Sequence, residues 1–194
     1  MRVLVISKPE PVVNWEDADA HLKLGGDVSL QAEVEAMIAA ATEMVDGPDG
    51  WLGRALGVQT LEARFDCFEY ELRLPCPPLI DLDSVKYINS AGDLVTLDAA
   101  RYELIDRSVL PIGCWPASQP DRREAVRARY RAGHVTDPEA DELVPDLPYR
   151  ARAAILMMVE DLYTHRGSIR PGVFTELQMS TTVKNLLSGL RVYS

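Results

Sequence analysis

Three side chains have the chemical types needed for a nucleophilic hydrolase site. Cys114 would supply the nucleophile, His134 the general base and Asp137 the carboxylate that orients the imidazole. Such sets arise by chance in most chains of this length, and no nucleophile-elbow pattern accompanies this one. We therefore expect a protein without enzymatic activity, and keep an intracellular enzyme of unknown class as the alternative.

The other reactive residues predict neither a metal site nor a cofactor. Cys67, Cys76 and Cys114 are widely spaced, without a Cys-x-x-Cys pair or a histidine at metal-ligand spacing. We expect them to be reduced and mostly buried thiols. The Gly-Gly pair at 25–26 lacks the following Lys and Ser/Thr of a phosphate loop. His165 falls in the last turn of a predicted helix, where it suits a cap better than a base.

Three arginines lie on one face of a predicted strand over 126–132. Arg127, Arg129 and Arg131 alternate there with apolar residues. Three guanidinium groups in line could follow a phosphate backbone. They could also form cross-strand ion pairs, which is the commoner arrangement and the favoured interpretation. The candidate partners are Glu62, Asp66, Glu69 and Glu71.

The charge balance argues against nucleic acid as a ligand of the average surface. The 194 residues include 30 acidic and 20 basic side chains, for a formal net charge of -10. The acid-rich stretch 136–146 is expected to be a solvated loop, or an electronegative rim that keeps DNA from sticking. The apolar runs at 3–6 and 153–159 are too short for a secretion signal and for a membrane span of about 20 residues. We expect an intracellular chain without a membrane anchor.

Periodicity places helices at both ends and strands between them. A short helix follows Asn14, a good N-cap, and a longer one carries an apolar stripe from Leu30 to Val45. From Gln59 the period changes to two. The predicted strands span 59–67, 70–74, 85–88, 94–97, 101–105 and 126–132, with a loop at 111–123. A late helix opens at Pro148, followed by an extended piece at 173–179 and a short helix within 182–190.

This order predicts an α+β fold: a small helical bundle with a β-rich insertion between the first long helix and the late helix. We divide the single domain into an N-terminal helical part (1–58), the β-rich insertion (59–133) and C-terminal helices with a tail (134–194). Pro75, Pro77 and Pro78 fix an extended crossing between two strands, because their rings restrict φ.

Two segments carry more apolar surface than a monomer needs. The late helix has two adjacent apolar stripes, so a neighbouring subunit is expected on one side of it. The residues expected at this interface are Ile155, Leu156, Val159, Leu162 and Tyr163. The tail is also apolar for a chain end. Its residues are Leu186, Leu187, Leu190, Arg191, Val192 and Tyr193.

A series of landmarks resembles the head-tail connector, or adaptor, proteins of long-tailed bacteriophages and gene transfer agents. They occur in the family's order through nearly the whole chain. They are "WEDADAHLKL", "AAATEMVDG", "WLGRAL", "LRLPCPPLIDLDSVKYINSAGDLVTLD", "VRARYRAGH" and "VPDLPYRARAAILMMVEDLYTHRG". The proline crossing and its following hairpin are the most specific. The "GPDG" insertion before Trp51 and the long loop around Trp115 depart from the family pattern.

The resemblance implies a structural virion protein without a cofactor. Such subunits form a ring, commonly a dodecamer, at the head-tail junction below the portal protein. The ring continues the DNA channel, which DNA traverses without specific binding, and meets a stopper or tail terminator protein on the tail side. By this resemblance the tail 186–194 docks onto the portal, although packing on its own bundle is the alternative. The chain would be made in the bacterial cytoplasm. A phage DNA-binding regulator using the arginine strand is a further alternative.

Overall fold

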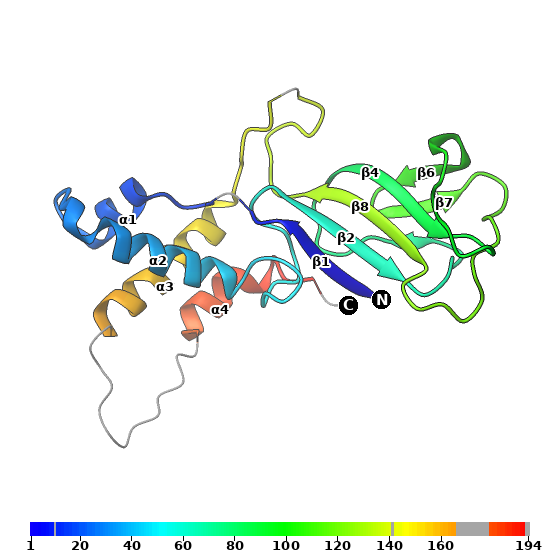
Figure 1. Ribbon diagram of the computed structural model, residues 1–194. Coiled ribbons are helices and arrows are strands. Elements are labelled where there is room, and N and C mark those ends of the chain that lie inside the picture. Colours follow the sequence, from blue (N-terminus) through cyan, green and yellow to red (C-terminus); the bar gives the residue numbers. More distant parts are fainter. Residues whose placement is uncertain (10, 141, 166–178, 193–194) are drawn as a thin grey trace, which may run out of the picture.

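The computed structural model describes residues 1–9, 11–140, 142–165 and 179–192, in which helices lie to one side of a two-layered β structure (Figure 1). The helices are α1 (Trp15–Leu22), α2 (Gln31–Glu43), α3 (Tyr149–His165) and α4 (Thr181–Ser188). The strands are β1 (Arg2–Ser7), β2 (Gln59–Phe65), β3 (Leu72–Arg73), β4 (Leu79–Ile88), β5 (Leu94–Thr96), β6 (Tyr102–Ile105), β7 (Ser108–Pro111) and β8 (Val126–Ala132). The predicted extended piece at 173–179 lies outside the described residues, apart from Met179. None of the described helices is long and apolar enough to cross a membrane.

The strands form two antiparallel sheets that share one core. The larger sheet has the order β1-β2-β8-β4-β5 and the smaller one β3-β7-β6. In β8 the apolar residues are buried and the arginines between them are more accessible, as the alternation predicted. The apolar face of the larger sheet packs with residues of the smaller one, such as Leu72 and Val109.

The α+β class is confirmed, but the expectation of a small β insertion in a helical bundle is wrong. The sheets are large, and the larger one takes its edge strand β1 from the segment that we expected to be helical. The prediction also lacked strand β7 (Ser108–Pro111), whose last residue is the first residue of the predicted loop at 111–123. The apolar run Val3–Ile6 is an edge strand with exposed Val5 and Ile6, so it shows no clean alternation.

The proline crossing connects the two sheets through its carbonyl groups. Tyr130 of β8 donates its hydroxyl hydrogen to the Pro75 carbonyl at 2.8 Å. The Pro77 and Pro78 carbonyls accept from the Ala55 and Gly133 amides at 3.2 and 3.0 Å. Prolines lack an N–H, so these three residues take part in the hydrogen bonding as acceptors only.

The helices have a second core of their own. Asn14 accepts a hydrogen bond from the Asp17 amide at 2.9 Å and so caps α1, as predicted. Helix α2 buries much of the predicted stripe, and α3 and α4 close the core from the other side. The fully buried residues include Val34, Ala41, Leu52, Ala154, Ile155, Val159, Val183 and Leu187.

Candidate assembly surfaces

Of the predicted interface residues of α3, two lie in the core and three are half-buried. Ile155 and Val159 are fully buried within the chain's own helical core. Leu156, Leu162 and Tyr163 pack against the edge of that core and remain half-buried. Both apolar stripes of α3 are therefore used at least partly by the chain itself, and a subunit contact at this helix stays a prediction.

The tail residues are also partly used inside the chain. Leu187 and Leu190 belong to the helical core and Leu186 packs at its edge. The Arg54 guanidinium donates to the Leu190 carbonyl at 2.8 Å. Tyr193 lies outside the described residues.

The end of the tail is held against the segment that follows α2. The Val192 amide donates to the Leu52 carbonyl at 2.9 Å. The Arg191 guanidinium lies over the Trp51 ring, 4.5 Å from its centroid. Docking of the tail onto a portal stays a prediction, and it concerns only the accessible part of these residues.

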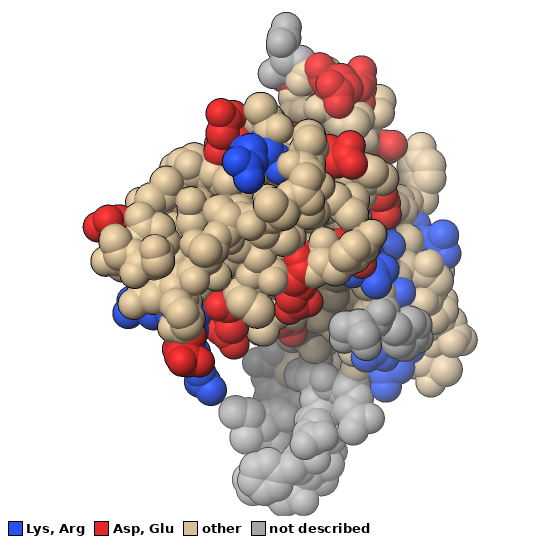
Figure 2. Space-filling view, turned by 90° about the vertical axis from the view of Figure 1, so that its right-hand side faces the viewer, with Lys and Arg blue, Asp and Glu red and all other residues tan. Residues whose placement is uncertain are grey.

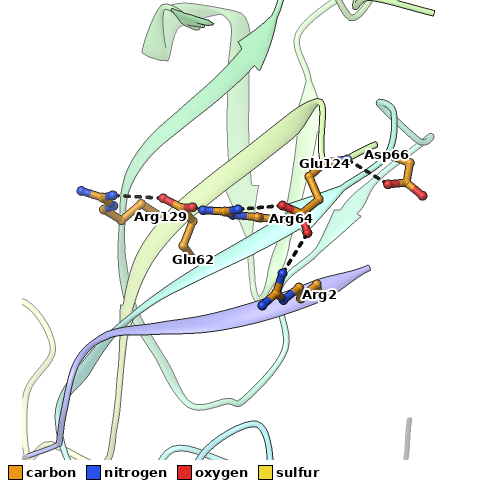
Figure 3. A network of polar contacts seen from close by, with 6 residues as sticks. All are labelled: Arg2, Glu62, Arg64, Asp66, Glu124 and Arg129. Carbon is orange, nitrogen blue, oxygen red and sulfur yellow. Dashed lines mark hydrogen bonds and ion pairs between the residues drawn. The ribbon is translucent and has the colours of Figure 1, made fainter. Parts of the chain in front are cut away.

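The outer face of the larger sheet carries a network of alternating charges (Figure 3). Glu62 of β2 accepts from Arg129 at 3.0 Å and from Arg64 at 2.8 Å. Arg64 continues to Glu124 at 2.6 Å, and Glu124 contacts Arg2 at 3.4 Å. The predicted cross-strand pairing with Glu62 is thus confirmed for Arg129.

Burial and ion pairing shift the pKa of Glu62 in opposite directions. Its side chain is nearly buried, which alone would raise the pKa of the carboxyl group. The hydrogen bonds from Arg64 and Arg129 outweigh burial, so the pKa of Glu62 lies below its usual value. Arg131 pairs with Asp81 of β4, a partner that the sequence did not indicate because the register of β4 on β8 was unknown.

The acid-rich stretch forms an exposed loop that projects from the molecule between β8 and α3 (Figure 1). Its two sides are joined by an amide-to-carbonyl hydrogen bond from Thr136 to Val144 at 2.9 Å. A second bond runs from Asp146 to the His134 carbonyl at 3.0 Å. Figure 2 shows acidic side chains gathered near the top of the molecule, where this loop lies in Figure 1. This agrees with the expected solvated acidic loop.

The hypothetical hydrolase trio is not assembled. Trp115, next to Cys114, stacks on Phe68, which contacts Tyr87 beside the first residue of β8. His134 is the second residue beyond the other end of β8, so the seven-residue strand, about 20 Å long, separates the two sites. Burial lowers the pKa of His134, as does the nearby Arg54.

The cysteines and His165 have no arrangement suited to chemistry. Cys76 is buried, and burial raises the pKa of its thiol to about 12. Cys67 and Cys114 are exposed, so the expectation of mostly buried thiols is wrong for these two. His165 Nδ1 lies 2.8 Å from the Asp161 carbonyl, consistent with the predicted role at the helix end. The described residues include no cluster that could hold a metal ion.

A buried carboxylate joins the two cores, and the sequence analysis missed it. Asp46, at the end of α2, accepts from the Leu56 amide at 2.7 Å and from the Gln59 side chain at 3.1 Å. Burial raises the pKa of Asp46, although these hydrogen bonds oppose the shift. Asp46 directly follows Val45, the last residue of the predicted apolar stripe, and only the three-dimensional structure shows that its side chain turns inward.

A groove of about 930 Å³ runs beside Asp46, between the end of β1 and α2. Val5, Ile6 and Ile38 contribute apolar surface, and Glu35 and Glu43 are among its acidic residues.

The described arrangement defines a class of fold: an antiparallel two-sheet structure joined to a small helical bundle through a buried polar contact. Solved structures from gene transfer agent (GTA) particles share it over the full chain. A chain in the neck of a native GTA particle, computed with C12 symmetry, matches with a TM-score of 0.64 and 16% identity. A chain in the virion of a native GTA particle and one in the neck of an empty particle, computed with C6 symmetry, each match with a TM-score of 0.67 and 17% identity.

Each match covers 100% of this chain and 97% of the other. At this identity the likeness establishes a shared fold. No family model and no curated protein matches the sequence.

Proposed function

We propose that this chain is a structural, non-enzymatic component of the neck of a gene transfer agent or a related phage particle. The observation that carries the proposal is the fold shared, end to end, with chains of GTA neck and virion structures. The landmark sequences that resemble head-tail connectors support it independently, since they are features of the amino-acid sequence alone.

The finer proposal is a ring adaptor below the portal, with a stopper or tail terminator protein on its other side. The C12 and C6 symmetries used for the neck structures support a ring of identical copies. DNA would pass through the ring without specific binding, for which the net charge of -10 is suited. The chain would be made in the bacterial cytoplasm and end in the neck of the virion.

The experiment is cryo-electron microscopy of purified particles from cells that carry the gene. We expect density for this chain as a ring between portal and tail. A different chain occupying every ring of the neck would refute the proposal. Particles that keep normal tails after deletion of the gene would refute it as well.

The proposed docking tail needs a test that leaves the core intact. Deleting 186–194 would remove buried Leu187 and Leu190, so loss of portal binding could reflect unfolding. Arg191 is exposed, and Arg191→Glu removes its contact with Trp51, a contact that contributes about 1 kcal/mol or less at an exposed site. We expect weaker portal binding with a folded chain; unchanged binding would remove Arg191 from the docking surface.

A further inference from the structure

Four cations stand side by side across four neighbouring strands of the larger sheet. Arg2 of β1 pairs in register with Arg64 of β2, and Arg64 with Arg127 of β8. Arg127 pairs in turn with Lys86 of β4. We call these four residues the cation row. Like charges directly opposite each other on a sheet repel, so the row requires compensation.

The chain compensates only one half of the cation row. Glu124 lies between Arg2 and Arg64 and contacts both (Figure 3). Among the described residues, no carboxylate forms an ion pair with Arg127 or Lys86, and the buried Nε of Arg127 has no hydrogen-bond partner. The Arg127 Nε itself is buried, but the side chains of Arg127 and Lys86 are half-buried, so their accessible ends offer uncompensated positive charge to an anionic group from outside the chain.

The chain also has an unpaired group of the opposite charge. The acidic loop, here residues 136–140 and 142–146, has exposed carboxylates at Asp137, Glu139, Glu142 and Asp146. None of them forms an ion pair with a described residue, and the Asp137 carboxylate accepts a hydrogen bond from the nearby Glu139 amide at 3.0 Å. The loop projects away from the molecule and is braced across its base, so it is accessible to a second copy (Figure 1).

The two charged regions cannot neutralise each other within one chain. Arg127 is the second residue of β8, and the acidic loop begins only after the strand has ended. The seven-residue strand places them about 20 Å apart. A loop and a sheet face that meet between copies form a heterologous contact, which closes into a ring when its rotation allows.

We propose that the acidic loop of one copy docks on Arg127 and Lys86 of the next copy in the ring. The proposal rests on the proposed function, because it requires neighbouring copies. An acidic polypeptide suits this face better than DNA does, since Glu62, Glu124 and Asp81 are interspersed with the cations and would repel phosphates.

The first test neutralises the row with the double substitution Arg127→Gln and Lys86→Gln. The isolated chain should fold normally, because the change removes mutual repulsion and breaks no ion pair of the described residues. In cells that produce particles, the fraction of heads that carry tails should fall about tenfold or more. The matched control is Arg73→Gln, an exposed arginine on the smaller sheet, which should leave that fraction unchanged. Normal tail joining by the neutralised chain would overturn the proposal.

The second test exchanges the charges. One variant has a basic loop (Asp137→Lys, Glu139→Lys, Glu142→Lys and Asp146→Lys), which leaves the stretch 136–146 with more positive than negative side chains. The other has an acidic row (Arg127→Glu and Lys86→Glu). Alone, each would bring like charges together and should fail to form rings. Mixed, they should form rings in which the two variants alternate, because each basic loop then meets an acidic row and each acidic loop a basic row.

The outcomes separate this proposal from the proposed function. Failure of both variants alone with recovery in the mixture supports loop-to-row docking. Failure without recovery, with circular dichroism showing folded chains, overturns it. Salt-dependent binding of duplex DNA that the neutralised variant lacks, together with normal rings, would identify DNA as the occupant. If the wild-type chain forms no ring in the neck at all, the proposed function itself fails.

Discussion

Removing the carboxylate of Asp46 should destabilise the junction between the two cores. Asp46→Ala leaves two buried donors without acceptors: the Leu56 amide, now at 2.7 Å from Oδ1, and the Gln59 side-chain amide at 3.1 Å. A buried donor left unpaired costs about 1–3 kcal/mol, so the loss of acceptors for two donors should cost roughly 2–6 kcal/mol. This is a large share of the roughly 5–15 kcal/mol by which domains are stable.

Asp46→Asn should cost less, because its remaining oxygen can accept from Leu56 and its new amide can donate to Gln59 if that side chain turns over. Asp49→Ala is the matched control: it removes an exposed carboxylate from the same loop and should change stability by less than about 0.5 kcal/mol. The assay is urea unfolding at neutral pH, followed by circular dichroism and tryptophan fluorescence. A cost below that of the Asp49 control would refute the assignment of Asp46 as a structural acceptor.

The difference in stability between the wild type and Asp46→Asn should depend on pH, with a sign that the pKa of Asp46 determines. Burial raises the pKa of Asp46 in the folded state above its ordinary value of 3.8, although its hydrogen bonds oppose the shift. The folded chain then holds the proton more tightly than the unfolded one, so this contribution is complete below pH 3.8 and is lost as pH rises through the folded pKa. The stability of the wild type relative to Asp46→Asn should therefore decline as pH rises across that window. A relative stability that increases with pH would show that the hydrogen bonds outweigh burial.

Three further outcomes follow from the structure. Glu62→Gln should lower the unfolding free energy by roughly 1–3 kcal/mol at pH 7. Because the pKa of Glu62 is lowered in the folded chain, its stabilising contribution is lost in acid, so the cost of the substitution should diminish as pH falls below 4.5. A cost that does not change with pH in denaturant unfolding would contradict the ion pairs as the origin of this stabilisation. Leu187→Ala should lower the unfolding free energy of the isolated chain by about 2–5 kcal/mol, since the side chain is fully buried, whereas a purely docking leucine would leave it unchanged. A thiol reagent should label Cys67 and Cys114 in the folded chain and spare Cys76, whose pKa is raised to about 12; mass spectrometry counts the labels on each chain. Rapid labelling of all three cysteines would show that Cys76 is accessible to solvent.

Local patterns predicted the elements whose side chains alternate or recur cleanly. The two-residue period of β8 and the stripe of α2 were readable because one face of each element is buried and the other is not. The cap at Asn14 was readable because an asparagine side chain can accept from a free amide in the first turn. Strand β1 was missed because an edge strand with little covered surface does not show that period.

The candidate surfaces depend on information that the linear sequence does not contain. The cation row follows from the register of four strands, and a shift of one residue would turn each of these side chains to the other face. Likewise, apolar composition predicted that Leu187 and Leu190 would be covered. It could not distinguish a partner from the chain's own helical core.

Because β1 precedes the helices in the sequence but belongs to the larger sheet, no single break in the chain separates the helical part from the sheets. The first strand of the chain pairs with β2, Arg2 opposite Arg64, and the whole of α1 and α2 is threaded between them. Because β2 follows both helices in the sequence, β1 reaches its partner only by a long-range contact, the kind that slows folding. A fragment that starts at β2 would expose an unprotected strand edge, and recombination between relatives would have to exchange the first strand together with the sheet it completes.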